Sequence, residues 1–340
     1  MNQGTHSVEW RRIITRHINQ RTAKHPEVGL DVAVQVPHTG DFAAPGFVRD
    51  YCQAAEAAGF TAVWTVDHLV VPDRVESRYP LAATPQVVSG DAMRDTMGAN
   101  LEQNTVLAVA AAVTSTIELG TAVSVVTNRH PVLNARQLAT IDLFAGGRLV
   151  YGVGVGWLRE EGETMGADWR RRGAQAEEHV RILRRIWSAD GRSVDFDGDF
   201  WAIPAMDPRP LPPRGTIPVL IGGYSPAALD RVARLGDGWV TARISPERFT
   251  RLREDIARAC ERHGRDLEAL RLVAWASTAR LRSEARDVLR GDPGEVRAEL
   301  RRYAAAGVTQ LRVGGDVSSP DESIAWLEEF GRLFLTEDGA

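Results

Sequence analysis

Short apolar runs alternate with longer segments of helical spacing along most of the chain. The apolar runs are rich in Val, Ile and Leu, which is typical of buried parallel strands. They occupy residues 30–36, 61–66, 117–123, 148–154, 217–221, 238–241, 270–276 and 310–313. Helical spacing follows each run, at 45–58, 101–113, 131–144, 174–188, from 226, 246–263, 293–305 and 321–334. Eight strands, each followed by a helix, predict a (β/α)8 TIM barrel.

The alternative fold for such a pattern is a doubly wound open sheet. An open sheet usually carries its nucleotide-binding glycines after the first strand. Here the first strand leads into Val36-Pro37-His38-Thr39, which has no glycine, so the pattern favours the barrel. Two insertions interrupt it: a hairpin over 193–203, turning at Asp197-Gly198, and an irregular stretch over 69–100. Loops as long as the second are usually functional, so we expect it to cover the substrate.

The chain divides into an N-terminal extension, residues 1–28, and a single barrel domain, residues 29–337. The extension concentrates basic side chains, with no acid between Glu9 and Glu27. Trp10 and Ile13 belong to a helical spacing that is compatible with a targeting or membrane-surface helix. The extension lacks the apolar core of a signal peptide, and we favour a mobile or surface-docked segment.

The bulk composition is that of an ordinary globular protein. A 44% hydrophobic fraction over 340 residues is enough for one large core. The net charge of −4 gives no reason to expect nucleic acid or an anionic membrane as a partner. No apolar run approaches the roughly 20 residues that span a bilayer. Cys52 and Cys260 lie in predicted helices far apart in sequence, which predicts buried free thiols and a cytoplasmic protein.

Glycines follow two of the predicted strands. The strand at 148–154 ends in Gly152-Val-Gly-Val-Gly156-Trp157, and the strand at 217–221 ends in Gly222-Gly223. Glycines let a backbone approach a ligand closely, and the free N–H groups of a following helix bind phosphate. A tight strand-to-helix turn without a ligand is the other reading of each motif. In barrels, strand exits build the active site, so we predict a binding pocket at this rim.

The Asp67-His68 pair follows the second strand, and His68 is the candidate for proton transfer. Imidazole titrates near neutral pH, so it can act as acid or base, and Asp67 is placed to orient it or to bind a ligand. A simple strand cap is the alternative. We name Arg78, Tyr79 and His130 as candidate substrate contacts, although His130 precedes a helix-starting proline and can be a cap. The histidines show no metal-ligand spacing, and we predict no metal.

Three blocks of the chain, taken together, resemble the bacterial luciferase-like superfamily of flavin and deazaflavin enzymes. They read WTVDHLVVPDRVESRYP, IELGTAVSVVTNRHPVLNARQLATIDLFAGGRLVYGVGVGWLREE and IPVLIGGYSPAALDRVARLGDGWV, and the resemblance covers roughly residues 29–315. It is greatest to the branch described as dependent on coenzyme F420, a deazaflavin. The resemblance implies a barrel that holds a flavin-like ring across its C-terminal mouth, often in a dimer.

Carried over by position, the resemblance makes His68 the active-site histidine and Asp67 a cofactor contact. It also implies a strand-three bulge with a non-proline cis peptide near Ala122-Val123. The full set of predicted cofactor contacts is Val36, Asp67, Thr121, Ala122, Val123, Val155, Gly156, Trp157, Gly222, Gly223, Tyr224 and Ser225. Sugar-phosphate dehydrogenases of this superfamily carry an acidic residue where Trp157 and Leu158 stand here, which argues against the same substrate.

The resemblance predicts an F420-dependent oxidoreductase, in which a hydride passes between the deazaflavin C5 and an organic substrate and His68 donates or accepts a proton. The first alternative is a monooxygenase that uses reduced FMN and O2, since the same fold binds both cofactors. The second is a flavin-binding barrel without catalysis. A metal-dependent hydrolase barrel is a further reading. We expect a homodimer, and the sequence does not identify the substrate.

Overall fold

Eight parallel strands close into a barrel in the computed structural model, which describes residues 29–44, 46–78, 98, 100–276, 292–314 and 317–335. Around the barrel the order is β1–β2–β3–β5–β8–β9–β10–β11, and pairing between β3 and β5 closes the ring. The strands are β1 (Asp31–Gln35), β2 (Ala62–Thr65), β3 (Glu118–Thr121), β5 (Leu149–Gly154), β8 (Val219–Gly222), β9 (Gly238–Ile244), β10 (Arg271–Ala276) and β11 (Gln310–Val313). The predicted TIM-barrel fold is confirmed.

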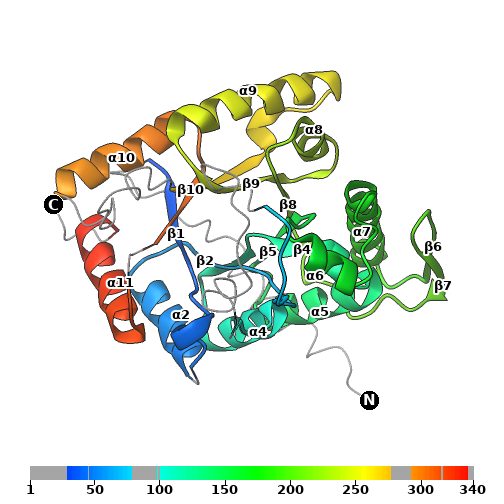
Figure 1. Ribbon diagram of the computed structural model, residues 1–340, viewed down its shortest axis with the longest axis horizontal. Helices are drawn as coiled ribbons and strands as arrows, with labels where there is room; N and C mark the ends of the chain where they lie inside the picture. The colour runs from blue at the N-terminus through cyan, green and yellow to red at the C-terminus, as the bar shows by residue number, and fades with distance from the viewer. Residues whose placement is uncertain are drawn as a thin grey trace, which may run out of the picture.

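Helices surround the strands in chain order, as the ring in Figure 1 shows. They are α2 (Phe47–Ala57), α4 (Gln103–Val113), α5 (Pro131–Phe144), α7 (Arg172–Trp187), α8 (Pro226–Leu235), α9 (Pro246–Arg262), α10 (Pro293–Ala305) and α11 (Pro320–Phe334). Five of them begin with a proline whose fixed φ suits the first turn. Short 3-10 turns lie at Gly40–Phe42, Val126–Asn128 and Leu267–Ala269.

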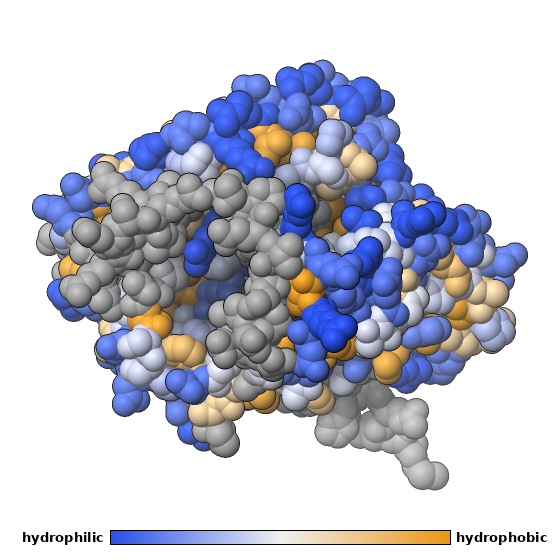
Figure 2. Space-filling view, viewed as in Figure 1, coloured by the Kyte–Doolittle hydropathy of each residue, from blue (hydrophilic) through white to orange (hydrophobic). Residues whose placement is uncertain are grey.

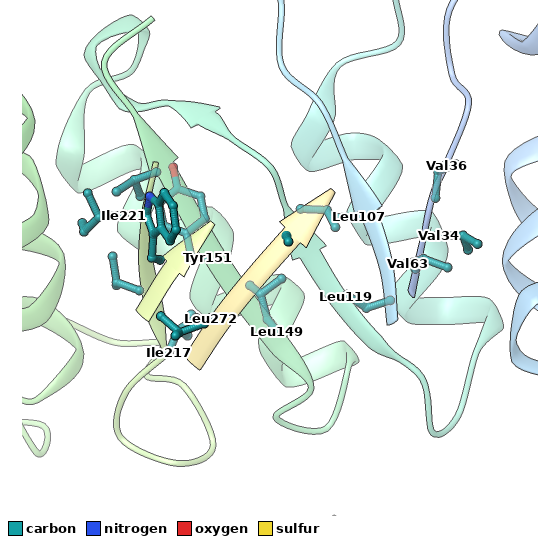
Figure 3. Packing of buried hydrophobic residues seen from close by; sticks show 14 of the residues in the cluster. Val34, Val36, Val63, Leu107, Leu119, Leu149, Tyr151, Ile217, Ile221 and Leu272 are labelled. Carbon is teal, nitrogen blue, oxygen red and sulfur yellow. The ribbon is translucent and has the colours of Figure 1, made fainter. Parts of the chain in front are cut away.

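Two apolar layers hold the barrel together. The larger lies between strands and helices, and Figure 3 shows part of it, including Val34, Leu119 and Ile221. The smaller fills the barrel interior and includes Ala33, Trp64 and Val240. The interior is tightly packed: a Cβ built on Gly120 would lie 2.3 Å from the Trp64 ring. Most residues on both faces of the barrel strands are therefore buried, which explains the continuous apolar runs in the sequence.

The third strand of the barrel is interrupted. After β3, the chain passes Ala122 and Val123 and resumes as β4 (Ser124–Val125), which pairs with β5. The peptide bond between Ala122 and Val123 is cis, as predicted. A Cβ on Gly152 of β5 would lie 2.0 Å from the Thr121 carbonyl oxygen, so only glycine allows this approach of the two strands. The interruption brings residues 122 and 123 to the barrel mouth.

The predicted hairpin is present as β6 (Val194–Asp197) and β7 (Ala202–Met206), and both cysteines are buried free thiols. The short helix α6 (Arg159–Thr164), which follows the Gly152–Trp157 motif, was not predicted. The N-terminal extension lies outside the described residues. Within the part of the chain that the structure describes, no helix has the length and apolar content needed to cross a membrane.

Candidate active site

A pocket of about 530 Å³ opens where the barrel strands end. Figure 2 looks onto this end of the molecule and shows a hollow near the middle of the face. The wall is mostly apolar, and among the described residues every barrel strand except β11 contributes to it at or near its end. The predicted site residues that line the pocket are Val36, Asp67, His68, Ala122, Val123, Val155, Gly156, Trp157, Gly222, Gly223 and Tyr224.

Four other predicted residues do not line the pocket. Thr121 is buried and donates its hydroxyl to the Gly152 carbonyl at 2.7 Å. The Ser225 hydroxyl accepts from the Ala228 N–H and caps α8. His130 is exposed and caps α5 by accepting from the Val132 N–H, and Arg78 is exposed on the loop after β2. Tyr79 lies outside the described residues.

His68 is held by a glutamate that the sequence analysis missed. Its Nδ1 lies 3.0 Å from Oε2 of Glu161, on helix α6. The other oxygen of Glu161 accepts from the backbone N–H groups of Leu69 and Val70, at 2.5 and 3.1 Å. A carboxylate oxygen only accepts hydrogen bonds, so this contact assigns the Nδ1–H form to the neutral ring and leaves Nε2 for a bound molecule. The Glu161 side chain is only 2% exposed.

Asp67 does not orient His68 in this way. Its carboxylate forms a two-point ion pair with Arg129 and accepts from the Val125 N–H at 2.8 Å. Arg129 also donates to Glu102, the N-cap of α4. Burial alone would lower the pKa of Arg129, but the Asp67 charge beside it raises this pKa above its usual value. The pair ties the exit of β2 to the 122–129 segment, which forms the neighbouring pocket wall.

Glycines make a narrow, flat wall beside the cis peptide. A Cβ on Gly154 would lie 2.4 Å from Cγ2 of Val123, and one on Gly222 would lie 2.8 Å from Cγ1 of the same residue. A side chain at either position would therefore push Val123 out of place. Glycines and apolar side chains on three neighbouring strand exits suit a planar aromatic group, such as an isoalloxazine or deazaflavin ring.

Helix α6 also fixes the chain that follows His68. Glu160 accepts from the backbone N–H groups of Glu76 and Ser77, at 2.6 and 3.0 Å, and from the Ser77 hydroxyl. The same hydroxyl accepts from the Arg159 N–H. Together with the contacts of Glu161, these bonds attach residues 68–77 to the first turn of α6. The segments that follow β2 and β5 are therefore bonded to each other beside the pocket.

His38 is a further buried histidine on the pocket wall. Its Nδ1 lies 2.9 Å from the Val36 carbonyl oxygen and its Nε2 lies 3.2 Å from that of Val66. Burial lowers the pKa of His38. Both ring nitrogens face backbone carbonyls, so the ring links the exits of β1 and β2. Among the described residues, no group of three or more His, Cys, Asp or Glu side chains is placed to hold a metal ion.

The sequence model of a family described as luciferase-like monooxygenase matches residues 27–290. An uncharacterized protein of Mycobacterium tuberculosis is 33% identical over 223 residues, which are 64% of this chain and 73% of that protein.

Two solved structures show the same fold. One is the coenzyme F420-dependent tetrahydromethanopterin reductase of Methanopyrus kandleri, with a TM-score of 0.68 and 19% identity over 89% of this chain and 97% of that chain. The other is a monooxygenase of Streptomyces bottropensis, with a TM-score of 0.66 and 20% identity over 89% of this chain and 98% of that chain. The fold is therefore shared by proteins of both reaction types.

Proposed function

Because the chain belongs to the luciferase-like monooxygenase family, we propose that it is an oxidoreductase that binds coenzyme F420 and catalyses hydride transfer to or from an organic substrate. The observation that carries the proposal is a histidine, His68, held by a buried glutamate beside a glycine-walled apolar pocket. The similarity to an F420-dependent reductase supports the choice of cofactor.

The residues of the pocket suit the cofactor's ring and its phosphate. Gly154 and Gly222 keep the wall beside Val123 flat, and Val155, Gly156 and Trp157 continue it. Gly222 and Gly223 precede the N-terminus of α8, which suits a phosphate group because free N–H groups and the helix dipole favour an anion there. When bound, the deazaflavin supplies a two-electron centre that accepts or donates a hydride.

The protein's own part of the reaction is to hold the reactants and move one proton. If a hydride leaves a substrate alcohol carbon, the hydroxyl proton must leave as well, and His68 Nε2 accepts it. In the reverse direction the protonated ring returns this proton to the carbonyl oxygen. Glu161 beside Nδ1 stabilises the imidazolium in both directions. The apolar wall limits water near the reacting groups.

An FMN-dependent monooxygenase is the second candidate, and the structural similarity to a monooxygenase favours it. A binding barrel without catalysis is the third. Stopped-flow measurements with a panel of ketones and aldehydes, made with reduced F420 and separately with reduced FMN and O2, distinguish the three candidate functions. We expect substrate-dependent return of the F420 absorbance without O2. Turnover only with reduced FMN and O2 would replace the proposal by the second candidate, and no turnover with either cofactor would favour the third.

We also propose that the protein is a homodimer that associates through the outward faces of α4 and α5. Helix α4 contains no charged residue, and Val109 on it is 39% exposed. Leu133 and Phe144 on the neighbouring α5 are 56% and 66% exposed. Figure 1 shows the two helices side by side. Apart from the exposed Arg136 of α5, these outward faces carry neutral and apolar side chains, and such a face can pair with its own copy across a twofold axis.

The oligomeric state tests this second proposal. Light scattering after gel filtration should give twice the chain mass of 37.3 kDa. The double substitution Leu133→Glu and Phe144→Glu should give a monomer, because it places charges on both sides of the contact. A monomeric wild-type protein, or a dimeric double variant, would contradict the assignment of this face.

A further inference from the structure

Three large side chains form a stack on one wall of the barrel mouth. Arg243 of β9 pairs in register with Trp275 of β10, Trp275 pairs with Arg312 of β11, and Arg312 pairs with Ala33 of β1. Ala33 belongs to the cluster inside the barrel, and directly paired residues of neighbouring strands point to the same face. The guanidinium carbons of Arg243 and Arg312 lie 4.7 and 5.1 Å from the Trp275 ring centre.

A bulge in β9 turns Arg243 inward. Val240 pairs with Val273 and Arg243 pairs with Trp275, so β9 advances three residues while β10 advances two. Val240 faces the interior, and regular alternation from it would direct Arg243 toward the helices. The extra residue reverses the alternation at this point. Bulges commonly re-aim side chains beside binding sites.

The stack carries two positive charges that no carboxylate in the described residues neutralises. Arg312 is 1% exposed, and its Nη2 donates to the Thr241 carbonyl, while Nε and Nη1 have no hydrogen-bond partner in the part of the chain that the structure describes. Burial lowers the pKa of Arg312 to about 9. Arg243 is exposed, and among the described residues its charged group contacts the Trp275 ring. Cation–π contacts offset part of the cost of such charges, and an anion would offset more.

The stack lies on the side of the barrel mouth away from the candidate proton carrier, and of its three members Trp275 lines the pocket. In the closed barrel, β9 is the fourth strand from β2 in either direction, so Arg243 and His68 lie on opposite sides of the mouth. Trp275 lines the same pocket as His68. A molecule that occupies this pocket and reaches His68 therefore extends toward Arg243. The cofactor wall of Val123, Gly154 and Gly222 belongs to the strand exits that lie between these two sides.

We propose that Arg243, backed by Trp275 and Arg312, binds an anionic oxygen group of the substrate, a carboxylate or a phosphate. The enzyme then acts on an acidic organic molecule whose reacting carbon lies near His68 and whose charge lies at the β9–β11 wall. The proposal rests on the proposed function only in naming the bound molecule a substrate. A planar guanidinium can bind either group through two parallel hydrogen bonds.

Calorimetric titration with benzoate and benzamide tests the site, because the two probes share a shape and differ in charge. The full-length protein is titrated with and without saturating F420. We expect the wild type to bind benzoate at least about ten-fold more tightly than benzamide, and Arg243→Gln to lose that preference. Arg251→Gln, an exposed arginine of α9, is the matched control and should keep it. A wild type without the preference, or an Arg243→Gln variant that retains it, overturns the proposal.

A second titration distinguishes the substrate from the acidic tail of the cofactor. Wild type and Arg243→Gln are titrated with F420 and with the deazaflavin chromophore that lacks the tail. The proposal predicts equal affinities of the two proteins for each. If Arg243→Gln weakens only the binding of F420, the arginine serves the cofactor and the proposal is wrong. The benzoate titration needs no cofactor, so it remains readable even if the protein does not bind F420.

Discussion

A Glu161→Gln variant would change the contact that positions His68 and keep the hydrogen bonds that hold the loop after it. The amide keeps one oxygen, which can still accept from the Leu69 and Val70 N–H groups. The other oxygen, opposite His68 Nδ1, becomes an NH2 group. An NH2 group donates, so Nδ1 must accept and the neutral ring must carry its proton on Nε2. The substitution therefore reverses the tautomer of His68 with little change of shape.

The size of each effect follows from these contacts. Three charge-assisted hydrogen bonds become neutral ones or change direction, which costs on the order of 1 kcal/mol each, about 3 kcal/mol in total. For a barrel of roughly 300 residues, this lowers Tm by about 5 °C. A misplaced proton carrier typically costs about 100-fold or more in kcat. Glu161 does not line the pocket, so the F420 dissociation constant should change by less than about three-fold.

Two measurements check this prediction. Nitrogen-15 NMR of labelled histidine reports which ring nitrogen of His68 carries the proton, and steady-state kinetics with F420 report kcat and KM. Glu163→Gln, on the same helix but 56% exposed, is the matched control and should change neither. A reversed tautomer without a lower kcat, or a loss of F420 affinity as large as the loss of kcat, would contradict the positioning role of Glu161.

Three further predictions concern the walls of the site and the core. Arg129→Met leaves the Asp67 carboxylate buried without its cation, so denaturant unfolding should show that the free energy of unfolding falls by about 3–5 kcal/mol. Adding Asp67→Asn to this variant should recover part of the loss. A double variant that is as unstable as Arg129→Met alone would contradict the pairing. Gly154→Ala displaces Val123 and should raise the F420 dissociation constant about ten-fold, whereas Gly314→Ala, whose Cβ meets no atom within 4 Å, should leave it unchanged. Burial raises the pKa of Asp142 to about 6, above its value in the unfolded chain, so the contribution of this carboxyl to folding stability falls as pH rises from about 4 to 6. Calorimetry should therefore show the Tm of Asp142→Asn rising relative to that of the wild type across this pH range. A Tm difference that stays constant with pH would refute the raised pKa of Asp142.

Much of the barrel could be predicted because its signals are local. Buried parallel strands need continuous apolar runs, and a proline at the start of a helix marks its first turn in the sequence. The predicted ranges 131–144 and 293–305 coincide with α5 and α10, each of which has a capping residue before its proline. Strand exits carry the pocket in any such barrel, so the Asp67-His68 pair and the glycine motifs led to most of the residues that line it.

The missed features depend on contacts between distant segments. Glu161 lies 93 residues from His68 and sits on a six-residue helix, which is too short to give a periodic signal. Asp67 is adjacent to His68 in sequence, but its carboxylate pairs with Arg129, 62 residues away. The inward turn of Arg243 follows from the pairing register of β9 with β10, which the apolar pattern does not encode. A neighbour in sequence was therefore a poor guide to the partner of a buried charge.

The ratio of the dissociation constants for F420 and FMN shows which of the two cofactors this pocket prefers. Both are measured anaerobically with the purified full-length protein, in the oxidised and reduced states. We expect F420 to bind at least about ten-fold more tightly than FMN, and Gly154→Ala to weaken F420 binding. Tighter binding of FMN, or no binding of either cofactor, would contradict the assignment of this pocket to a deazaflavin.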